Sequence, residues 1–309
     1  STGQTVFPGV GIKNFLGNKV AFIGMTLEGT PTIVSPSGVA GLNFGDEADT
    51  VNSLVPLLKA QGIQSIVVVV HEGGFPTVSG GQCTGISGAI LDIVNRLDPA
   101  VDLVISGHTH QEYNCLLNNS AGKPIRVTSA FQYARRLTNI DMVIDTKTKD
   151  VLSITANNVA VPVPAVTNNT VPLNASVQEV VDHYAAESAV PAARVVGTIT
   201  ATLSRAFSTA GESALGDVIA DAQLAATASP TTGNAVIAFM NPGGIRADIP
   251  FAAAGKTDGN VTYGEAFTTQ PFGNSLVTMT LTGAQIYAAL EQQWGTAQPF
   301  PRILQVSNG

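Results

Sequence analysis

Three of the four histidines follow segments that the sequence predicts to be β-strands. His71 comes directly after the apolar run at residues 67–70, and His108 and His110 come after the run at residues 101–105. Binding sites in α/β sheets form at the carboxyl ends of strands, so the three imidazoles converge if these two strands are neighbours. Neutral imidazole is a common protein ligand of zinc, manganese and iron. The pattern therefore predicts a metal site; the competing interpretation is that each histidine is only a polar residue at a strand end.

The carboxylates near these histidines are too few for a complete two-metal centre. Two dications need bridging and terminal carboxylates, because three neutral imidazoles do not offset their charge. The candidates are Glu72, Asp102 and Glu112. Asp102 lies within the strand that leads to His108, so we expect it to point elsewhere, and none of the three has the Asp-x-His spacing expected of a bridging ligand. The residues alone therefore predict half of a two-metal site.

The two cysteines, Cys83 and Cys115, lie in stretches rich in Gly, Ser and Asn that resemble loops or strand ends. One pair of cysteines in a chain of this length is consistent either with two buried thiols or with one disulfide formed in an oxidising compartment. We favour the disulfide, which would link the two segments that carry the histidines.

The first half of the chain alternates between strand and helix signals. Strands are predicted at residues 19–27, 64–70 and 101–105, helices at residues 46–61 and 86–97, and further strands within residues 124–154. The β-branched run that ends at Val70 is typical of a strand covered on both faces. Asp46 can cap the first helix and Gly62 can end it. This alternation predicts a layered α/β domain.

An extended segment and a helix separate this domain from a second one. Residues 157–174 are rich in Pro, Val, Asn and Thr and are predicted to be a linker or a final strand. The helix predicted next, at residues 174–188, carries the fourth histidine, His183, which we interpret as a surface residue. The second half has predicted strands at residues 194–202, 235–239 and 275–281 and predicted helices at residues 213–228 and 282–293. We expect a first domain at 1–165, a linker with an inter-domain helix at 166–190, and a second domain at 191–309.

Composition excludes several classes of protein. Hydrophobic residues make up 44% of the 309 residues, which excludes wholesale disorder. The net charge of −7 argues against a nucleic-acid polymer as partner, since such binding depends on clustered cations. No apolar run approaches the roughly 20 residues of a membrane span. The sequence carries no leader that would give its address, and a processed secreted protein would look the same.

Two sets of motifs resemble known families. The block Gly107-His108-Thr109-His110, with an upstream strand ending in His71, resembles the last two blocks of calcineurin-like metallophosphoesterases. Four segments resemble the C-terminal domain of the 5′-nucleotidase family, and they lie at residues 212–222, 241–246, 262–274 and 281–286. The likeness covers nearly the whole chain, and the combination of the two domains is more specific than either set of motifs alone.

The resemblance implies a fold, an activity and a set of site residues. The fold would be α/β (α+β), a partial layered metallophosphoesterase-type sandwich joined by a linker helix to a 5′-nucleotidase C-terminal domain. The activity would be hydrolysis of nucleotide phosphoesters by water activated between two divalent metal ions. His71 and His108 resemble ligands of one metal and His110 a ligand of the other.

Further residues resemble the substrate-binding residues of the family. Asn241, Gly243 and Arg246 resemble a contact turn, and Phe272, followed by Gly273, resembles one of two aromatics that sandwich a nucleobase. A guanidinium holds phosphate or ribose oxygens by charge-assisted hydrogen bonds, and an aromatic face stacks on a base. The alternatives are a surface salt bridge for Arg246 and a core position for Phe272.

Several of the family's blocks are missing from this sequence. The Asp-x-His and Gly-Asn-His-Asp/Glu blocks do not occur, so no catalytic His–acid pair is assigned, and the segment with the second aromatic is also absent. The chain therefore resembles an interior part of such a protein. The cation nearest the family's phosphate-binding position before Glu212 is Arg205, since Thr209 and Gly211 stand there.

We expect a periplasmic or secreted metallophosphohydrolase whose partner is a small nucleotide or nucleoside. The alternative is a non-catalytic product that acts at most as a nucleoside-binding module. A structural zinc protein is a weaker alternative, because such a site needs four ligands. We expect this chain alone to bind metal weakly and to turn over little substrate.

Overall fold

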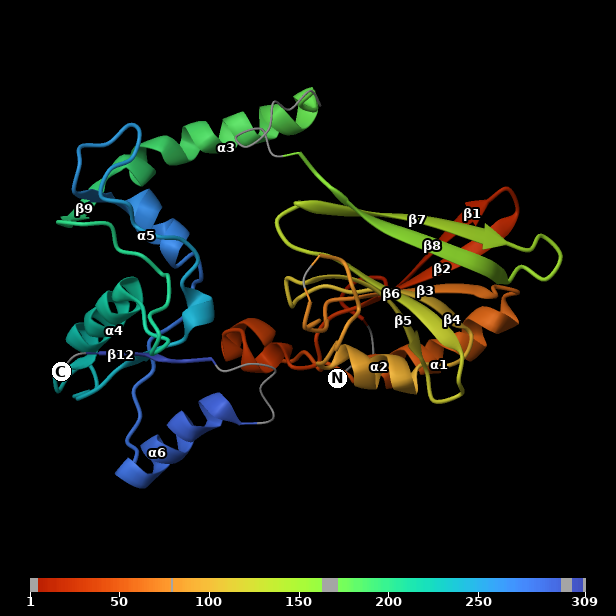
Figure 1. The fold of residues 1–309 in the computed structure, drawn as a ribbon, viewed down its shortest axis with the longest axis horizontal. Helices are drawn as coiled ribbons and strands as arrows, with labels where there is room; N and C mark the ends of the chain where they lie inside the picture. Colours follow the sequence, from red (N-terminus) through yellow and green to blue (C-terminus); the bar gives the residue numbers. More distant parts are fainter. Residues whose placement is uncertain (1–4, 79, 163–171, 296–301, 308–309) are drawn as a thin grey trace. The chain divides into compact units, whose positions relative to one another are not determined.

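A computed structural model describes residues 5–78, 80–162, 172–295 and 302–307. The chain divides into two compact units, Ser1–Val171 (unit 1) and Pro172–Gly309 (unit 2) (Figure 1). The predicted start of the linker, at residue 166, falls outside the described residues.

Unit 1 contains a six-stranded sheet in the order β1-β2-β3-β4-β6-β5. The strands are β1 (Val10–Phe15), β2 (Asn18–Met25), β3 (Ser65–Val70), β4 (Val101–Ile105), β5 (Glu112–Asn118) and β6 (Pro124–Ala130). The four central strands β2, β3, β4 and β6 are parallel, and β1 and β5 pair antiparallel at the two edges. The condition for the histidines to converge is thus met, since β3 and β4 are adjacent.

The sheet of unit 1 is covered on both faces (Figure 1). Helices α1 (Glu47–Ala60) and α2 (Ile90–Arg96) pack on one face, against a core that includes Ile66 and Val68. The hairpin of β7 (Arg136–Ile144) and β8 (Val151–Ala160) covers the other face, where Val67 packs near Ile140 and Met142. Alternate residues of β3 therefore enter two different cores, which explains why its sequence is β-branched throughout.

The predicted helix at residues 46–61 is confirmed as α1. The Asp46 side chain accepts a hydrogen bond from the Asp49 N–H, and Pro56 is accommodated inside the helix. The helix predicted at residues 86–97 begins later, at Ile90. The reason is local: Ser87 pairs with Phe75 through backbone hydrogen bonds, and Gly88 has a φ of 99°, which ends any helical path before Ala89.

Unit 2 has shorter elements. Its helices are α3 (Ala175–Ala193), α4 (Ala214–Thr227), α5 (Tyr263–Thr269) and α6 (Gly283–Glu291), and its strands are β9 (Val195–Thr198), β10 (Phe239–Met240), β11 (Asn260–Thr262) and β12 (Gln305–Val306). The strands form two antiparallel pairs, β9 with β11 and β10 with β12. The core is small and is formed by Leu215, Ile219, Ala220, Met240, Ile245, Ile249 and Val261.

The predicted strand at residues 275–281 is wrong for this structure. In the described part of unit 2 these residues have no ladder partner, and Val277 and Met279 are 75% and 70% exposed. An alternating sequence favours a strand, but a strand forms only where a neighbour satisfies its backbone groups. The strands predicted at 194–202 and 235–239 are likewise reduced to the short β9 and β10.

Candidate metal and substrate sites

The sheet of unit 1 brings His71 and His108 together. His71 directly follows β3, and its N–H donates to the Met25 carbonyl at 3.0 Å. His108 follows the adjacent β4. The two imidazole ring centroids lie 5.1 Å apart, with the ring planes at 66°. We call His71, His108, His110 and the loops that carry them the histidine edge.

Two glycines let the loops of the histidine edge touch. A Cβ atom on Gly73 would lie 2.3 Å from the carbonyl oxygen of Gly107, so only glycine fits there. The Gly107 N–H donates to the Glu72 carbonyl at 3.1 Å, and the Thr109 hydroxyl donates to the Gly74 carbonyl at 2.9 Å. The two loops are therefore in direct backbone contact.

His110 is held differently from the other two histidines. Its ring centroid lies 5.5 Å from that of Tyr133, and the backbone φ angles of His108 and His110 are 63° and 56°. Left-handed backbone is uncommon for non-glycine residues and concentrates at functional sites. Among the described residues, no trio of His, Cys, Asp or Glu at this edge has ligand atoms within 4.8 Å of one another. The structure thus pairs two of the three predicted ligands.

The three candidate carboxylates have other partners, and Asp102 lies at the end of the sheet opposite to the histidine edge. Asp102, at the start of β4, accepts hydrogen bonds from the Ile66 N–H at 3.0 Å and from Lys123 at 2.8 Å. Burial raises its pKa, an effect that the hydrogen bonds from Lys123 and Ile66 oppose. The Glu72 carboxylate accepts from the N–H of the next residue at 2.8 Å, and Glu112 forms an ion pair with Arg136 at 2.9 Å.

These contacts test how well the edge fits a metal centre. His71 and His108 offer nitrogen donors of the kind that a divalent cation takes. The carboxylates expected of a dinuclear centre are engaged in protein contacts instead. The described residues of this edge therefore provide the imidazole ligands of a metal site, while its carboxylate ligands would have to come from other groups.

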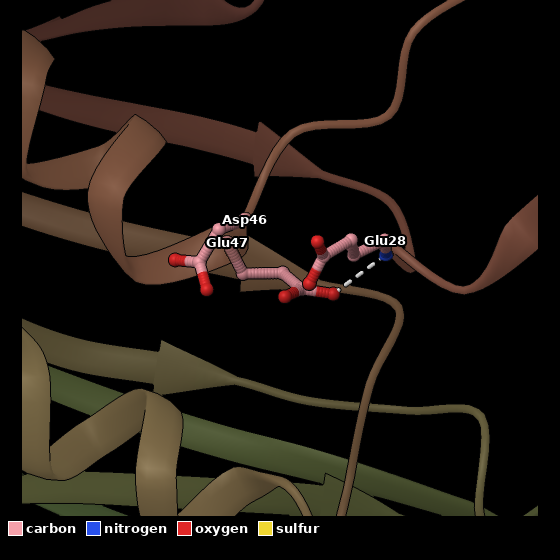
Figure 2. Close-up of side chains that lie close together, drawn as sticks. All are labelled: Glu28, Asp46 and Glu47. Carbon is pink, nitrogen blue, oxygen red and sulfur yellow. Dashed lines mark hydrogen bonds between the residues drawn. The ribbon is translucent and has the colours of Figure 1, made fainter.

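A separate acidic cluster, which sequence reasoning missed, lies where α1 begins. Ligand atoms of Glu28, Asp46 and Glu47 lie within 4.8 Å of one another (Figure 2). The buried Glu47 accepts a hydrogen bond from the Glu28 N–H at 2.7 Å, while Asp46 caps α1 and pairs with Arg96. Carboxylates at a helix N-terminus satisfy free N–H groups and the helix dipole. We therefore assign this cluster a structural role.

Cys83 and Cys115 form a disulfide in the structure. Cys115 is buried in β5, and Cys83 lies in the loop that follows the histidine edge of β3. The Asn114 N–H also donates to the Gly81 carbonyl at 3.2 Å. The bond thus fastens the loop after His71 to the edge strand β5.

The predicted substrate residues of unit 2 come together around one turn. Asn241 precedes the 3₁₀ turn Pro242–Gly244, and the Arg246 guanidinium donates to the Gly243 carbonyl at 3.1 Å. The same guanidinium lies 5.6 Å from the ring centroid of Phe272, a cation–π contact. Phe272 is 50% exposed, and the next residue, Gly273, is exposed too. Phe272 is therefore not a core aromatic.

A groove of about 1110 Å³ in unit 2 adjoins these residues. Its lining includes Asn241, Gly244, Gln270, Phe272 and Asn274. A volume of this order exceeds what a nucleoside needs, since small-molecule sites commonly measure about 300–1,000 Å³. Most of the remaining lining is aliphatic, from α4, β10 and residues 276–281, so the groove is largely apolar, with amide side chains and the exposed Phe272 ring along part of it.

The two units together define a class: a layered α/β domain with histidines at the carboxyl edge of its sheet, followed by a smaller α/β domain with an Arg–Phe contact at a turn. Residues 195–309 match the family model described as 5′-nucleotidase, C-terminal domain. The 5′-nucleotidase precursor of Thermus thermophilus is 26% identical, with a TM-score of 0.71 over 97% of this chain and 56% of that one. The predicted resemblance to the 5′-nucleotidase family and the predicted α/β fold class are confirmed.

Curated relatives are longer than this chain. Endonuclease YhcR of Bacillus subtilis is 29% identical over 95% of the chain, and cell wall protein Lmo0130 of Listeria monocytogenes is 30% identical over 96%. The chain spans 22% and 38% of their lengths. A sulfate thiohydrolase, SoxB of Thermus thermophilus, shares the fold with a TM-score of 0.63 at 17% identity, over 99% of this chain and 51% of that one. The fold therefore does not by itself decide the reaction.

Proposed function

We propose that this protein is a metal-dependent hydrolase of nucleotide phosphoesters. The observation that carries the proposal is the pairing of His71 and His108 at the ends of adjacent parallel strands, in a chain whose second half matches the 5′-nucleotidase C-terminal domain. A metal-binding edge and a nucleoside-binding turn in one chain are the two parts that such a reaction requires.

Each part has an assigned task. His71 and His108 would hold one divalent ion and His110 would contribute to a second. When bound, the ions supply Lewis acidity and lower the pKa of a water that attacks phosphorus. Phe272 would stack on the base, and Arg246 would hold phosphate or ribose oxygens through its guanidinium. Asn241, Gly243 and Gly273 would line the turn that receives the nucleoside.

The competing proposal is a nucleoside-binding module without catalysis. It is favoured by the carboxylates of Glu72 and Glu112, which have protein partners, and by the position of Asp102 at the start of β4, away from the histidine edge. Metal analysis separates the two proposals, because a catalytic protein holds a metal pair and a binding module holds one ion or none.

The disulfide, the relatives and the net charge indicate where the protein is located and what it binds. The Cys83–Cys115 disulfide favours an oxidising compartment, and one relative is named a cell wall protein, so we place the protein in the periplasm or outside the cell. In the described residues, no helix is both long and apolar enough to span a bilayer. One relative is named an endonuclease, but the net charge of −7 favours small nucleotides over a polymer for this chain.

The test follows the hydrolysis products of four substrates by chromatography, with and without manganese or zinc: adenosine and phosphate from AMP, UMP and glucose 1-phosphate from UDP-glucose, a nucleoside monophosphate from a cyclic nucleotide, and shorter fragments from single-stranded DNA. It uses both the protein as its organism makes it and the 309-residue chain. We expect metal-dependent release from a mononucleotide, reduced about 100-fold or more by His71→Ala or His108→Ala. His183→Ala, which changes an exposed histidine of α3, is the matched control. Release that is absent from the natural protein, or equal in all three variants, refutes the proposal.

A further inference from the structure

A buried tyrosine lies directly beneath the histidine edge. Tyr113, on β5, is fully buried, and its hydroxyl oxygen accepts a hydrogen bond from the Gly74 N–H at 3.1 Å. The same oxygen lies 2.5 Å from the hydroxyl oxygen of Ser106. Gly74 comes three residues after His71, and Ser106 comes two residues before His108. One phenol therefore contacts both histidine-bearing loops.

The hydrogen bonds of this network join both loops to β6. The Ser106 hydroxyl lies 2.8 Å from the Thr128 carbonyl, which can only accept, so Ser106 donates to it. With that bond made, Tyr113 donates to Ser106 while it accepts from Gly74; in the reverse arrangement Ser106 donates to Tyr113 and the phenol proton turns to Ser129. Tyr113 contacts both loops in either arrangement. Burial raises the pKa of the Tyr113 phenol, so the proton stays in place at neutral pH. The hydrogen bonds thus connect Gly74, Tyr113, Ser106 and the Thr128 carbonyl of β6 in one series.

The strand that carries Tyr113 is itself fixed. Tyr113 pairs with Ser129 in the β5–β6 ladder, and Cys115, two residues on and on the same face, holds the disulfide. Successive side chains of a strand alternate between faces, so Tyr113 and Cys115 both point inward. The phenol is therefore presented from an anchored strand to two loops whose own backbones have left the sheet.

We propose that Tyr113 is a positioning residue for the metal site: its hydroxyl couples the loop after β3 to the loop after β4 and so sets the separation of His71 and His108. This inference rests on the proposed function of those histidines as metal ligands. It assigns a role to a residue that contacts neither metal nor substrate, and its consequence is that metal affinity depends on a hydroxyl group below the site.

The test compares Tyr113→Phe with a control that loses a similar bond elsewhere. Phenylalanine keeps the ring and removes only the hydroxyl. The matched control is Ser65→Ala, because Ser65 is fully buried at the opposite end of β3 and donates to the Lys149 carbonyl at 2.8 Å. Ser106→Ala is a second variant, which removes a hydrogen-bond partner of the phenol and leaves the ring in its place. All variants are purified as the whole chain without metal.

Two measurements are made on each variant. Hydrogen exchange of the Gly74 amide in metal-free protein reports the link between the loops. We expect exchange at least about tenfold faster in Tyr113→Phe and unchanged in Ser65→Ala, because the loss of its acceptor exposes that N–H to opening. Calorimetric titration with zinc chloride reports affinity, and we expect it to weaken about tenfold in Tyr113→Phe, less in Ser106→Ala and not in Ser65→Ala.

Each contrary outcome has one meaning. Unchanged Gly74 exchange in Tyr113→Phe overturns the inference at its structural step. Equal zinc affinity in wild type and Tyr113→Phe overturns the inference and leaves the proposed function standing. Equal weakening in Tyr113→Phe and Ser65→Ala reduces the effect to general stability and also overturns it. A wild-type chain that binds no zinc overturns both the inference and the proposed metal site.

Discussion

The two candidate sites are anchored to the molecule in different ways. His71 and His108 follow central strands of a six-stranded sheet, and their loops touch through Gly73 and Gly107. Phe272 lies in a segment, residues 271–281, that joins no ladder in the described part of unit 2. Half of the Phe272 side chain is exposed, and its ring contacts the guanidinium of Arg246.

The two kinds of anchoring match the demands of the two proposed tasks, which are metal ligation by the histidines and base stacking by Phe272. Metal ligands must be held within about 0.5 Å of their working geometry, which rigid elements provide. An aromatic that stacks on a base tolerates sliding and tilting, because the interaction is spread over a face. Substitutions near the histidine edge should therefore act by moving the loops that carry the ligands. Substitution of Phe272 should act only by removing a contact with the base.

The largest expected effect is loss of the disulfide. A bond that joins cysteines 32 residues apart contributes about 3 to 4 kcal/mol in the chain-entropy model. Cys83→Ser combined with Cys115→Ser should lower the free energy of unfolding of unit 1 by that amount and leave unit 2 unchanged.

The chain offers a convenient probe for each unit in this experiment. The single tryptophan, Trp294, lies in unit 2, so its fluorescence during urea unfolding follows that unit. Hydrogen exchange of peptides from β3 to β5 follows unit 1. Dithiothreitol added to the wild type should reproduce the double variant. A shift of the Trp294 transition as large as that of unit 1 would contradict the idea that the bond acts on unit 1 alone.

The next effect concerns the contact between the two loops. Gly73→Ala places a methyl group 2.3 Å from the Gly107 carbonyl oxygen, so one loop must move. Overpacking against backbone should cost about 3 kcal/mol and should weaken zinc binding by separating the imidazoles. Gly24→Ala, on β2 of the same sheet, is the control, because a Cβ there has no neighbour within 4 Å. Equal zinc affinity in the two variants would show that the loop contact does not position the ligands.

Sequence periodicity predicts the histidine edge well because its information is local. The β-branched run before His71 and the run before His108 identify two buried strands, and parallel strands bring their carboxyl ends to one edge. The role of Tyr113 could not be predicted in the same way. Its partners Gly74 and Ser106 are 39 and 7 residues away in the chain, and nothing in the sequence around Tyr113 indicates which loops lie above it.

In unit 2, periodicity predicts a strand that the structure does not contain. Residues 275–281 alternate as a strand should, yet they form no ladder in the described part of the unit, because pairing depends on a neighbour that local sequence does not specify. The turn at residues 241–246 and the exposed Phe272 were identified by resemblance and not by periodicity. The later start of α2 could be predicted only in part. Gly88 indicates a break in the helix, but the sequence does not indicate that Ser87 pairs with Phe75.

The Phe272 turn should respond to loss of its exposed ring. Phe272→Ala should weaken binding of adenosine by about 2 kcal/mol, the usual scale of aromatic–base stacking, and should leave stability almost unchanged because the ring is half exposed. Phe267→Ala removes a comparably exposed ring, 55% accessible, from α5 and serves as control. Fluorescence or calorimetric titration measures both. Loss of affinity in Phe267→Ala alone would place the base elsewhere on unit 2.

The smallest expected effect contrasts a charged helix cap in unit 1 with a neutral one in unit 2. Asp46 caps α1, and its hydrogen bond with Arg96, followed by that from the Asp49 N–H, lowers its pKa below the usual value of an aspartate. Its stabilising contribution is therefore complete above the unfolded-state pKa and is lost as the pH falls through the folded-state value. Asp46→Ala should cost about 1 kcal/mol at neutral pH, and that cost should shrink below about pH 4.

Asn174, which caps α3 through a neutral amide, should cost a similar amount when changed to alanine, but without pH dependence. Urea unfolding of the wild type and both variants across this pH range checks the prediction, and a cost of Asp46→Ala that stays constant with pH would mean that the carboxylate caps α1 no differently from an amide.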